Sequence, residues 1–121
     1  MGNKKTLVLG ASTNPARYSY LAINQLRSKG HDVVAIGKHT GKVNDVEITA
    51  EQKPLENLDT VTLYLNANNQ KAYYDYIFSL KPKRIIFNPG AENSELESLA
   101  KEKNIIPQQA CTLVLLSTGQ Y

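Results

Sequence analysis

The sequence predicts an α/β fold, a Rossmann-like three-layer sandwich with a parallel sheet of about five strands. Two observations lead to this prediction. Short apolar runs alternate with helical stretches along the whole chain, and most of the runs end at a glycine or an asparagine. Strands joined through helices pair in parallel, and right-handed connections place the helices on both faces of the sheet. A length of 121 residues corresponds to one domain, so residues 1–121 are treated as a single Rossmann-like domain.

Five apolar runs are predicted to be strands. The first, Thr6–Leu9, is uninterrupted and ends at Gly10, as is typical of a buried parallel strand. The five runs cover residues 6–9, 32–36, 61–65, 84–87 and 105–107. Residues 38–59 are irregular, and within them we expect a short edge strand at Val46–Thr49 and a single helical turn at Pro54–Leu58.

Three helices are predicted between these strands. Residues 19–29 have helical spacing, with Ser19 as the N-cap, and residues 69–80 form a second helix that Pro82 ends. The third helix begins at the capping box Ser94-x-x-Glu97. An apolar tail at residues 113–116 is expected to dock on the body of the domain.

Composition narrows the class of protein. Apolar residues make up 41% and charged residues 21% of the chain, as in ordinary globular proteins. No apolar run approaches the roughly 20 residues of a membrane span, and the N-terminus lacks a signal-peptide pattern. Cys111 stands alone, which excludes a disulfide framework and a thiolate metal cluster. We therefore expect a cytoplasmic protein with neither a membrane nor a metal as partner.

The charge of the chain is unevenly distributed. Residues 1–43 contain seven Lys and Arg against one acid, whereas residues 44–121 contain seven Lys and Arg against ten acids. The positive first part favours an anionic small-molecule partner. The overall net charge of +3 is too small to indicate a nucleic acid.

Four turns follow the predicted strands at one edge of the sheet, because the carboxyl ends of parallel strands point the same way. Ligands of open α/β sheets bind at this edge, beside the point where the strand order reverses. We therefore expect a ligand crevice there. It is formed by small and polar residues: Gly10, Ala11, Ser12, Asn14, Pro15, Gly37, Lys38, His39, Asn66, Asn88, Pro89 and Gly90.

The first of these turns matches a phosphate-binding loop only in part. A turn between a buried strand and a helix can hold a phosphate on its backbone N–H groups. Ser12 stands where the dinucleotide fingerprint G-x-G-x-x-G has its second glycine, and Pro15 stands where it has its third. A plain strand-to-helix turn is the alternative interpretation.

The second turn discriminates between nucleotides. An NAD-binding domain places an acidic residue after its second strand to accept the ribose hydroxyl. This chain has Lys38 and His39 there, with no acid between Asp32 and Asp45. The basic turn disfavours NAD and favours a nucleotide with a phosphate on its ribose, which NADP and coenzyme A (CoA) both carry. Exposed cations on a solvated turn are the alternative.

Taken in order, these motifs resemble the stand-alone CoA-binding-domain family, which is similar to the N-terminal CoA-binding domain of succinyl-CoA synthetase alpha subunits. The resemblance runs over roughly residues 5–115. It rests on Gly10-Ala11-Ser12, Asn14-Pro15-x-Arg17, the turn after the second strand, Gly90-x-Glu92-Asn93 and Cys111. The chain departs from the family in two places. The family commonly has Asn-Pro-Lys where this chain has Gly37-Lys38-His39, and the family's proline after the strand that ends at Leu65 is replaced, near Ala67.

The resemblance implies where CoA would lie. Its phosphates would lie near Gly10, Ser12, Asn14 and Arg17, and its adenosine near Lys38 and His39. The pantetheine arm would extend toward Asn66 and Pro89-Gly90. Tyr18 and Tyr20 lie next to the first turn, and one of them could stack on the adenine or cover the edge of the sheet.

No catalytic arrangement is apparent in the sequence. His31 is expected on a solvated turn, His39 has no carboxylate placed to make it a base, and Cys111 is expected to be a buried structural thiol. We therefore expect non-catalytic binding of CoA or an acyl-CoA. The alternatives are an NADP-type nucleotide-binding module or small oxidoreductase, and an interaction protein with a vestigial nucleotide pocket. A protein partner or a homo-oligomer is compatible with each.

Overall fold

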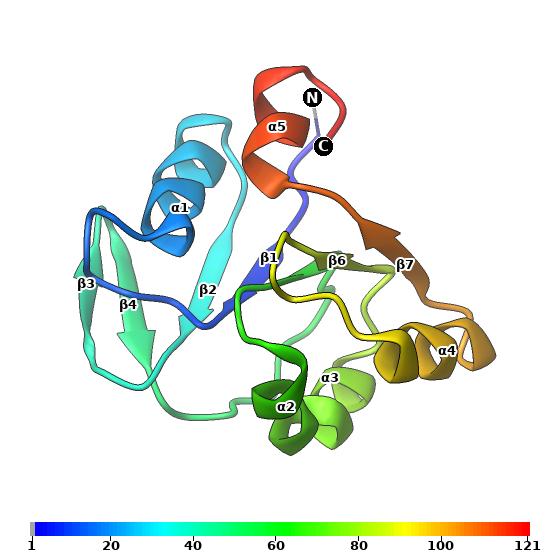
Figure 1. Cartoon of the computed structure of the whole chain (residues 1–121). Coiled ribbons are helices and arrows are strands. Elements are labelled where there is room, and N and C mark those ends of the chain that lie inside the picture. Colours follow the sequence, from blue (N-terminus) through cyan, green and yellow to red (C-terminus); the bar gives the residue numbers. More distant parts are fainter. Residues whose placement is uncertain (1) are drawn as a thin grey trace.

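The computed structural model describes residues 2–121 and confirms the predicted α/β fold class (Figure 1). The sheet has seven strands, not about five, in the order β3-β4-β2-β1-β5-β6-β7. Neighbouring strands are parallel except β3 and β4. The strands are β1 (Thr6–Leu9), β2 (Val33–Ile36), β3 (Gly41–Val43), β4 (Val46–Thr49), β5 (Thr60–Leu63), β6 (Arg84–Phe87) and β7 (Ile106–Gln109). The helices are α1 (Tyr18–Ser28), α2 (Ala67–Gln70), the 3-10 turn η1 (Lys71–Tyr73), α3 (Tyr74–Leu80), α4 (Ser94–Glu102) and α5 (Thr112–Ser117).

Strand β1 lies at the centre of the sheet, paired with β2 on one side and with β5 on the other. The chain builds outward from β1 through β2 to the β3–β4 hairpin, and then crosses back to add β5, β6 and β7. The strand order therefore reverses between β1 and β5. In open α/β sheets this is the position at which ligands bind.

Helices cover both faces of the sheet, as predicted. Helices α1 and α5 pack side by side on one face, and α3 and α4 lie on the other (Figure 1). Successive residues of β1 point to opposite faces: Leu7 and Leu9 join the core under α3 and α4, whereas Val8 joins the core under α1 and α5. All four residues of β1 and of β5 are buried, as expected of strands covered on both sides.

The outer part of the sheet differs from the prediction. The strand expected at Val46–Thr49 is β4, but it is not the edge, because β3 pairs antiparallel outside it. A tight turn at Asn44, with a φ of 57°, connects the two strands. Sequence reasoning missed β3 because three residues that include a glycine and a lysine show no clear alternation. The helical turn predicted at Pro54–Leu58 is wrong, since this connection contains no helix.

The helix starts also differ from the prediction. Helix α1 begins at Tyr18 with Arg17 as its N-cap, and Ser19 is buried in the first turn. Helix α4 is capped one residue earlier than expected, by Asn93. The helix predicted over residues 69–80 is divided into α2, η1 and α3. The polar residues at the start of this segment favour a continuous helix least, because asparagine has low helix propensity.

The apolar tail docks as predicted, in the form of helix α5. Leu115 and Leu116 are buried in the core that α5 shares with α1. The chain then reaches the edge of the sheet where the parallel strands begin, and there the Tyr121 hydroxyl contacts the Thr6 hydroxyl at the start of β1. The tail therefore ends at the edge opposite the predicted ligand crevice.

Candidate functional site

The turns after β1, β2, β5 and β6 lie at one edge of the sheet, because these four strands are parallel neighbours. We call this group of turns the strand-end rim, and it consists of residues 10–17, 37–40, 64–66 and 88–93. The rim includes the reversal point between β1 and β5. It brings together turns that lie far apart in the sequence, from the turn after Leu9 to the turn after Phe87.

The start of the turn after β1 is shaped by close backbone packing. Gly10 has a φ of +91°, and a Cβ at this position would lie 3.0 Å from the carbonyl carbon of Tyr64. The N–H groups of Gly10 and Ala11 both donate to the carbonyl oxygen of Ile36, at 2.9 and 3.0 Å. These residues therefore form the frame of the rim, and their N–H groups are already used within the protein.

The rest of this loop is held by short side chains. The Asn14 N–H donates to Ser12 Oγ at 3.0 Å, and the Ala16 N–H donates to Asn14 Oδ1 at 3.0 Å. The Ser12 hydroxyl is the acceptor of the hydrogen bond from the Asn14 N–H, so its own hydrogen remains available for donation to a ligand oxygen. Arg17 is exposed at the N-cap of α1. A hydroxyl, a guanidinium and a helix start are groups that suit a phosphate.

The turn after β2 packs directly on this loop. A Cβ at Gly37 would lie 2.2 Å from the Ala11 carbonyl oxygen, and a Cβ at Gly41 would lie 2.5 Å from the Thr13 Cγ2. Between the two glycines, the pair Lys38-His39 is exposed, and neither residue forms an ion pair with the acids of residues 2–121. The loop at residues 10–17, which we call the Ser12 loop, and the basic turn at residues 37–40 are therefore in contact with one another.

Asn66 and Asn88, two of the three asparagines predicted at the rim, differ in burial. Asn66 is exposed and caps α2 with its side chain. Asn88 is 2% exposed, and its Nδ2 donates to Thr62 Oγ1 at 2.7 Å and to the Leu63 carbonyl at 2.9 Å. Its Oδ1 accepts the Thr112 N–H at 2.9 Å. The Asn88 amide is therefore fully used beneath the rim, where it supports the turn after β6.

Behind the turn after β6 lies a buried polar cluster that sequence reasoning missed. Pro89 and Gly90 are the exposed part of the turn, and Gln70 and Asn93 lie behind it with 0% and 8% exposure. Asn93 Nδ2 donates to Gln70 Oε1 at 2.8 Å. The sequence carried one signal of this cluster. Gln70 lies three residues before Tyr73 and seven before Ile77, so it occupies a position on the apolar stripe of the predicted helix where an apolar residue is expected.

The predicted binding residues all lie in the strand-end rim or at the start of α1. Ser12 is half-buried, and the other predicted residues either form the frame of the rim or are exposed. The frame of the rim is formed by Gly10, Ala11, Gly37 and Asn88. The exposed residues are Asn14, Pro15, Arg17, Tyr18, Lys38, His39, Asn66, Pro89 and Gly90.

Two groups near the rim bear on its chemistry. Cys111 is a half-buried free thiol at the N-cap of α5, not the fully buried residue that was expected. Tyr64 follows β5 directly, and burial raises the pKa of its hydroxyl to about 12. The Tyr64 hydroxyl is therefore neutral at physiological pH and contributes no negative charge to the rim.

The expectation of a solvated His31 is wrong. Its side chain is fully buried, and its Nδ1 accepts the Lys4 N–H at 2.9 Å. Its ring lies 5.1 Å from that of Tyr121. The sequence neighbours misled the prediction, because Gly30 and Asp32 are exposed while the histidine ring between them turns inward.

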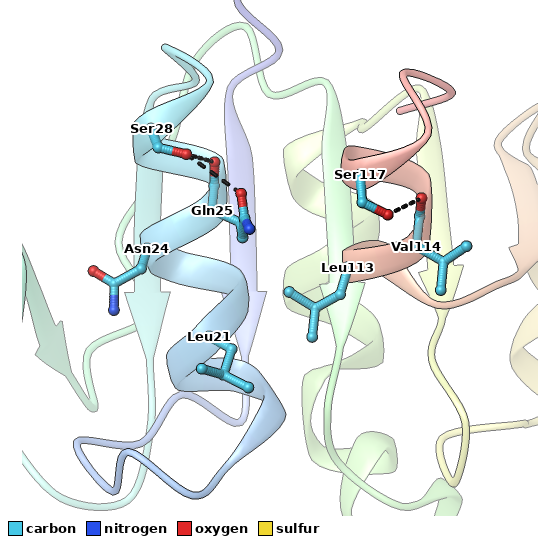
Figure 2. Close-up of a pocket in the computed structure, with 7 residues that line it drawn as sticks. All are labelled: Leu21, Asn24, Gln25, Ser28, Leu113, Val114 and Ser117. Atoms are coloured by element: carbon cyan, nitrogen blue, oxygen red, sulfur yellow. Dashed lines mark hydrogen bonds between the residues drawn. The ribbon is translucent and has the colours of Figure 1, made fainter.

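A surface groove of about 590 Å³ lies between α1 and α5 (Figure 2). It is lined by Leu21, Asn24, Gln25, Ser28, Leu113, Val114 and Ser117. None of these side chains is charged and none belongs to the strand-end rim, so the groove is distinct from the candidate site.

Residues 2–121 contain no group of three or more His, Cys, Asp or Glu placed to hold a metal ion. In the same part of the chain, no helix has the length and apolar character required to cross a bilayer.

The doubly covered sheet and its rim define a Rossmann-like α/β domain. By comparison with known families, the chain belongs to the family of CoA binding domains, which it matches over residues 4–117. No curated protein matches the chain.

Solved structures share the fold of this chain. A crystal structure of an uncharacterised protein shares 50% identity with the chain, with a TM-score of 0.97 and full coverage of both chains. A hypothetical protein from Pyrococcus horikoshii OT3 shares the fold at 20% identity, with a TM-score of 0.85, 96% of this chain and 83% of that chain covered. A dinucleotide-forming acetyl-coenzyme A synthetase from Ca. Korarchaeum cryptofilum, solved with phosphate and ADP, matches at 16% identity and a TM-score of 0.68. That match covers 91% of this chain but 26% of the synthetase.

Proposed function

We propose that residues 1–121 act as one unit that binds CoA or an acyl-CoA at the strand-end rim and performs no chemistry on it. The observation that carries this proposal is the contact between the Ser12 loop and the Lys38-His39 turn through Gly37. This contact places exposed positive charge beside a loop suited to phosphate. Membership of the CoA-binding-domain family supports the choice of ligand.

CoA fits the sequence of groups along the rim. Its diphosphate would lie between the Ser12 hydroxyl and Arg17, and its ribose phosphate would lie against Lys38 and His39. Charge-assisted hydrogen bonds of this kind are among the stronger polar interactions in proteins. The pantetheine arm would then continue past the β1–β5 reversal point toward Asn66 and Gly90.

NADP is the second candidate, because the same basic turn would also accept its ribose phosphate. The Ser12 loop weighs against it. A pyrophosphate of a dinucleotide approaches the backbone closely over the second glycine of the fingerprint, and a serine side chain at that position limits the approach. NADH is disfavoured further, because the turn after β2 offers no carboxylate to its ribose.

Calorimetric titration with CoA, NADPH and NADH tests the proposal. We expect saturable binding of CoA, weaker binding of NADPH and none of NADH. Lys38→Glu and Arg17→Ala should each weaken CoA binding by about 1–3 kcal/mol. Lys101→Glu, on the exposed last turn of α4, is the matched control and should leave the affinity unchanged.

Two outcomes would contradict the proposal. Saturable NADPH binding without any CoA binding would identify an NADP-type module. Absence of binding to all three nucleotides would identify a vestigial pocket and leave interaction with another protein as the function.

A further inference from the structure

The Gln70 side chain joins two turns of the strand-end rim. Its Nε2 donates to the carbonyl of Leu65, which follows β5, and to the carbonyl of Ala91, in the turn after β6. Both bonds measure 2.8 Å, and the side chain is 0% exposed. A single amide group therefore spans the gap between the two turns.

Other buried polar groups fix the orientation of this amide. Gln70 Oε1 accepts a bond from Asn93 Nδ2, which also donates to the Tyr74 hydroxyl, both at 2.8 Å. The Tyr74 hydroxyl donates in turn to Glu95 Oε1 at 3.0 Å. We call Gln70, Asn93 and Tyr74 the Gln70 brace. Because all its amide groups are paired, Gln70 cannot rotate without leaving a buried polar group unsatisfied.

The brace supports one half of the rim. It holds the turns at residues 64–66 and 88–93, whereas the Ser12 loop and the basic turn are held together by the close contacts of Gly37 and Gly41. Because Gly10 packs on Tyr64, the turn after β5 is tied to the phosphate-binding half, and the turn after β6 is the one that can shift while that half keeps its geometry.

We propose that Gln70 is a specificity-determining positioning residue, which favours ligands that extend an arm beyond their nucleotide by fixing the spacing of the β5 and β6 turns. The inference rests on the proposed function, in which the pantetheine arm of CoA lies beside Asn66 and Gly90. Gln70 does not touch the ligand. It acts through the Leu65 and Ala91 carbonyls, whose bonds prevent the two turns from separating.

The test compares two ligands on one variant. Gln70→Met keeps the length of the side chain and removes its amide. The ligands are CoA and the CoA fragment that ends at the diphosphate and lacks the pantetheine arm. We expect the variant, which loses all three hydrogen bonds of the Gln70 amide, to bind CoA roughly tenfold more weakly and to bind the fragment with an affinity within about twofold of the wild type. Gln25→Met, on the exposed face of α1, is the matched control and should change neither affinity.

A second variant keeps the test decisive if Gln70→Met fails to fold. Tyr74→Phe removes one hydroxyl from the outer end of the brace and leaves the Gln70 amide in place. It should show a smaller loss with the same selectivity for CoA over the fragment. An equal loss for both ligands, or no loss for either, would overturn the inference. A wild-type protein that binds neither ligand would instead overturn the proposed function.

Discussion

The surroundings of His31 oppose its protonation in the folded protein and lower its pKa. Burial is the main cause of its lowered pKa, and the cations of Lys4 and Arg84 act in the same direction, while Asp59 alone favours the charged form. Geometry adds to this effect. The His31 Nδ1 accepts the Lys4 N–H, so a proton on Nδ1 would place two donors face to face.

We predict that the free energy of unfolding falls as the pH drops below 6.5, the ordinary pKa of histidine. The sign follows from linkage: below this pH the unfolded chain binds a proton at His31 that the folded chain still excludes, so acid favours unfolding. The stabilisation is fully present above pH 6.5. One such group changes stability by at most about 1.4 kcal/mol per pH unit. Urea titrations at several pH values between 7.5 and 5 would measure the slope.

The chain contains two histidines, which provides a matched pair of variants. His31→Gln should flatten the pH dependence, because glutamine does not titrate. His39→Gln, at an exposed position, should leave it unchanged. A pH slope that survives in His31→Gln would show that another group causes it.

Helix α5 is anchored to the rim by buried polar contacts at its start. The Asn88 Oδ1 accepts the Thr112 N–H, and the Thr112 hydroxyl lies 2.8 Å from that of Thr62 on β5. With six residues, α5 is too short to be stable alone, so tertiary contacts must hold it. Asn88 therefore links the turn after β6 to the start of α5.

Asn88→Ala should destabilise the protein by about 2–4 kcal/mol, since it leaves the Thr112 N–H and the Leu63 carbonyl buried without their partner. Amide hydrogen exchange should speed up within residues 112–117 more than in α4. Asn68→Ala, at an exposed position of α2, is the control and should change stability little. If α5 exchanges as slowly in Asn88→Ala as in the wild type, Asn88 does not anchor it.

At the scale of the whole molecule, positive charge is concentrated in the first 43 residues, which form the Ser12 loop, the basic turn and helix α1. The net charge of the remaining chain is negative. Of these cations, Arg17 and Lys38 are exposed at the half of the rim where we place the phosphates, whereas Lys4 and Arg27 bond to the Tyr121 and His31 carbonyls at the opposite edge of the sheet. Attraction of a polyanionic ligand to such a surface depends on ionic strength.

We predict that CoA affinity falls by roughly tenfold between about 0.01 M and 1 M salt, over which the Debye length shrinks from about 30 to about 3 Å. The same titrations on Lys38→Glu should give a smaller salt dependence, because a contributing cation has been removed. Uncharged pantetheine serves as the control ligand, and its weak binding should not follow the salt concentration. A CoA affinity independent of salt would mean that the arm, and not the phosphates, carries the binding.

Much of this architecture could be predicted because it depends on local patterns. Uninterrupted apolar runs such as Thr6–Leu9 indicate buried strands wherever they pack, and alternation with helices implies parallel pairing. The strand ends then place the Gly10, Gly37, Asn66 and Asn88 turns at one edge. The basic character of the turn after β2 is likewise a property of the residues themselves.

Other features depended on contacts that the local sequence pattern does not show. The weak run at Gly41–Val43 became a strand because β4 offered it partners. His31 was buried by Tyr121 and Lys4, and the Gln70 amide found the Leu65 and Ala91 carbonyls.

The sequence by itself thus determined the fold class, the order of the turns and the sign of their charge. Each of these is set by residue type and spacing within a few positions along the chain. Only the tertiary structure decided which polar side chains face inward. Burying a polar group is costly unless hydrogen-bonding partners are in place, and partners such as the Ala91 carbonyl for Gln70 and the Thr112 N–H for Asn88 come from other elements of the fold.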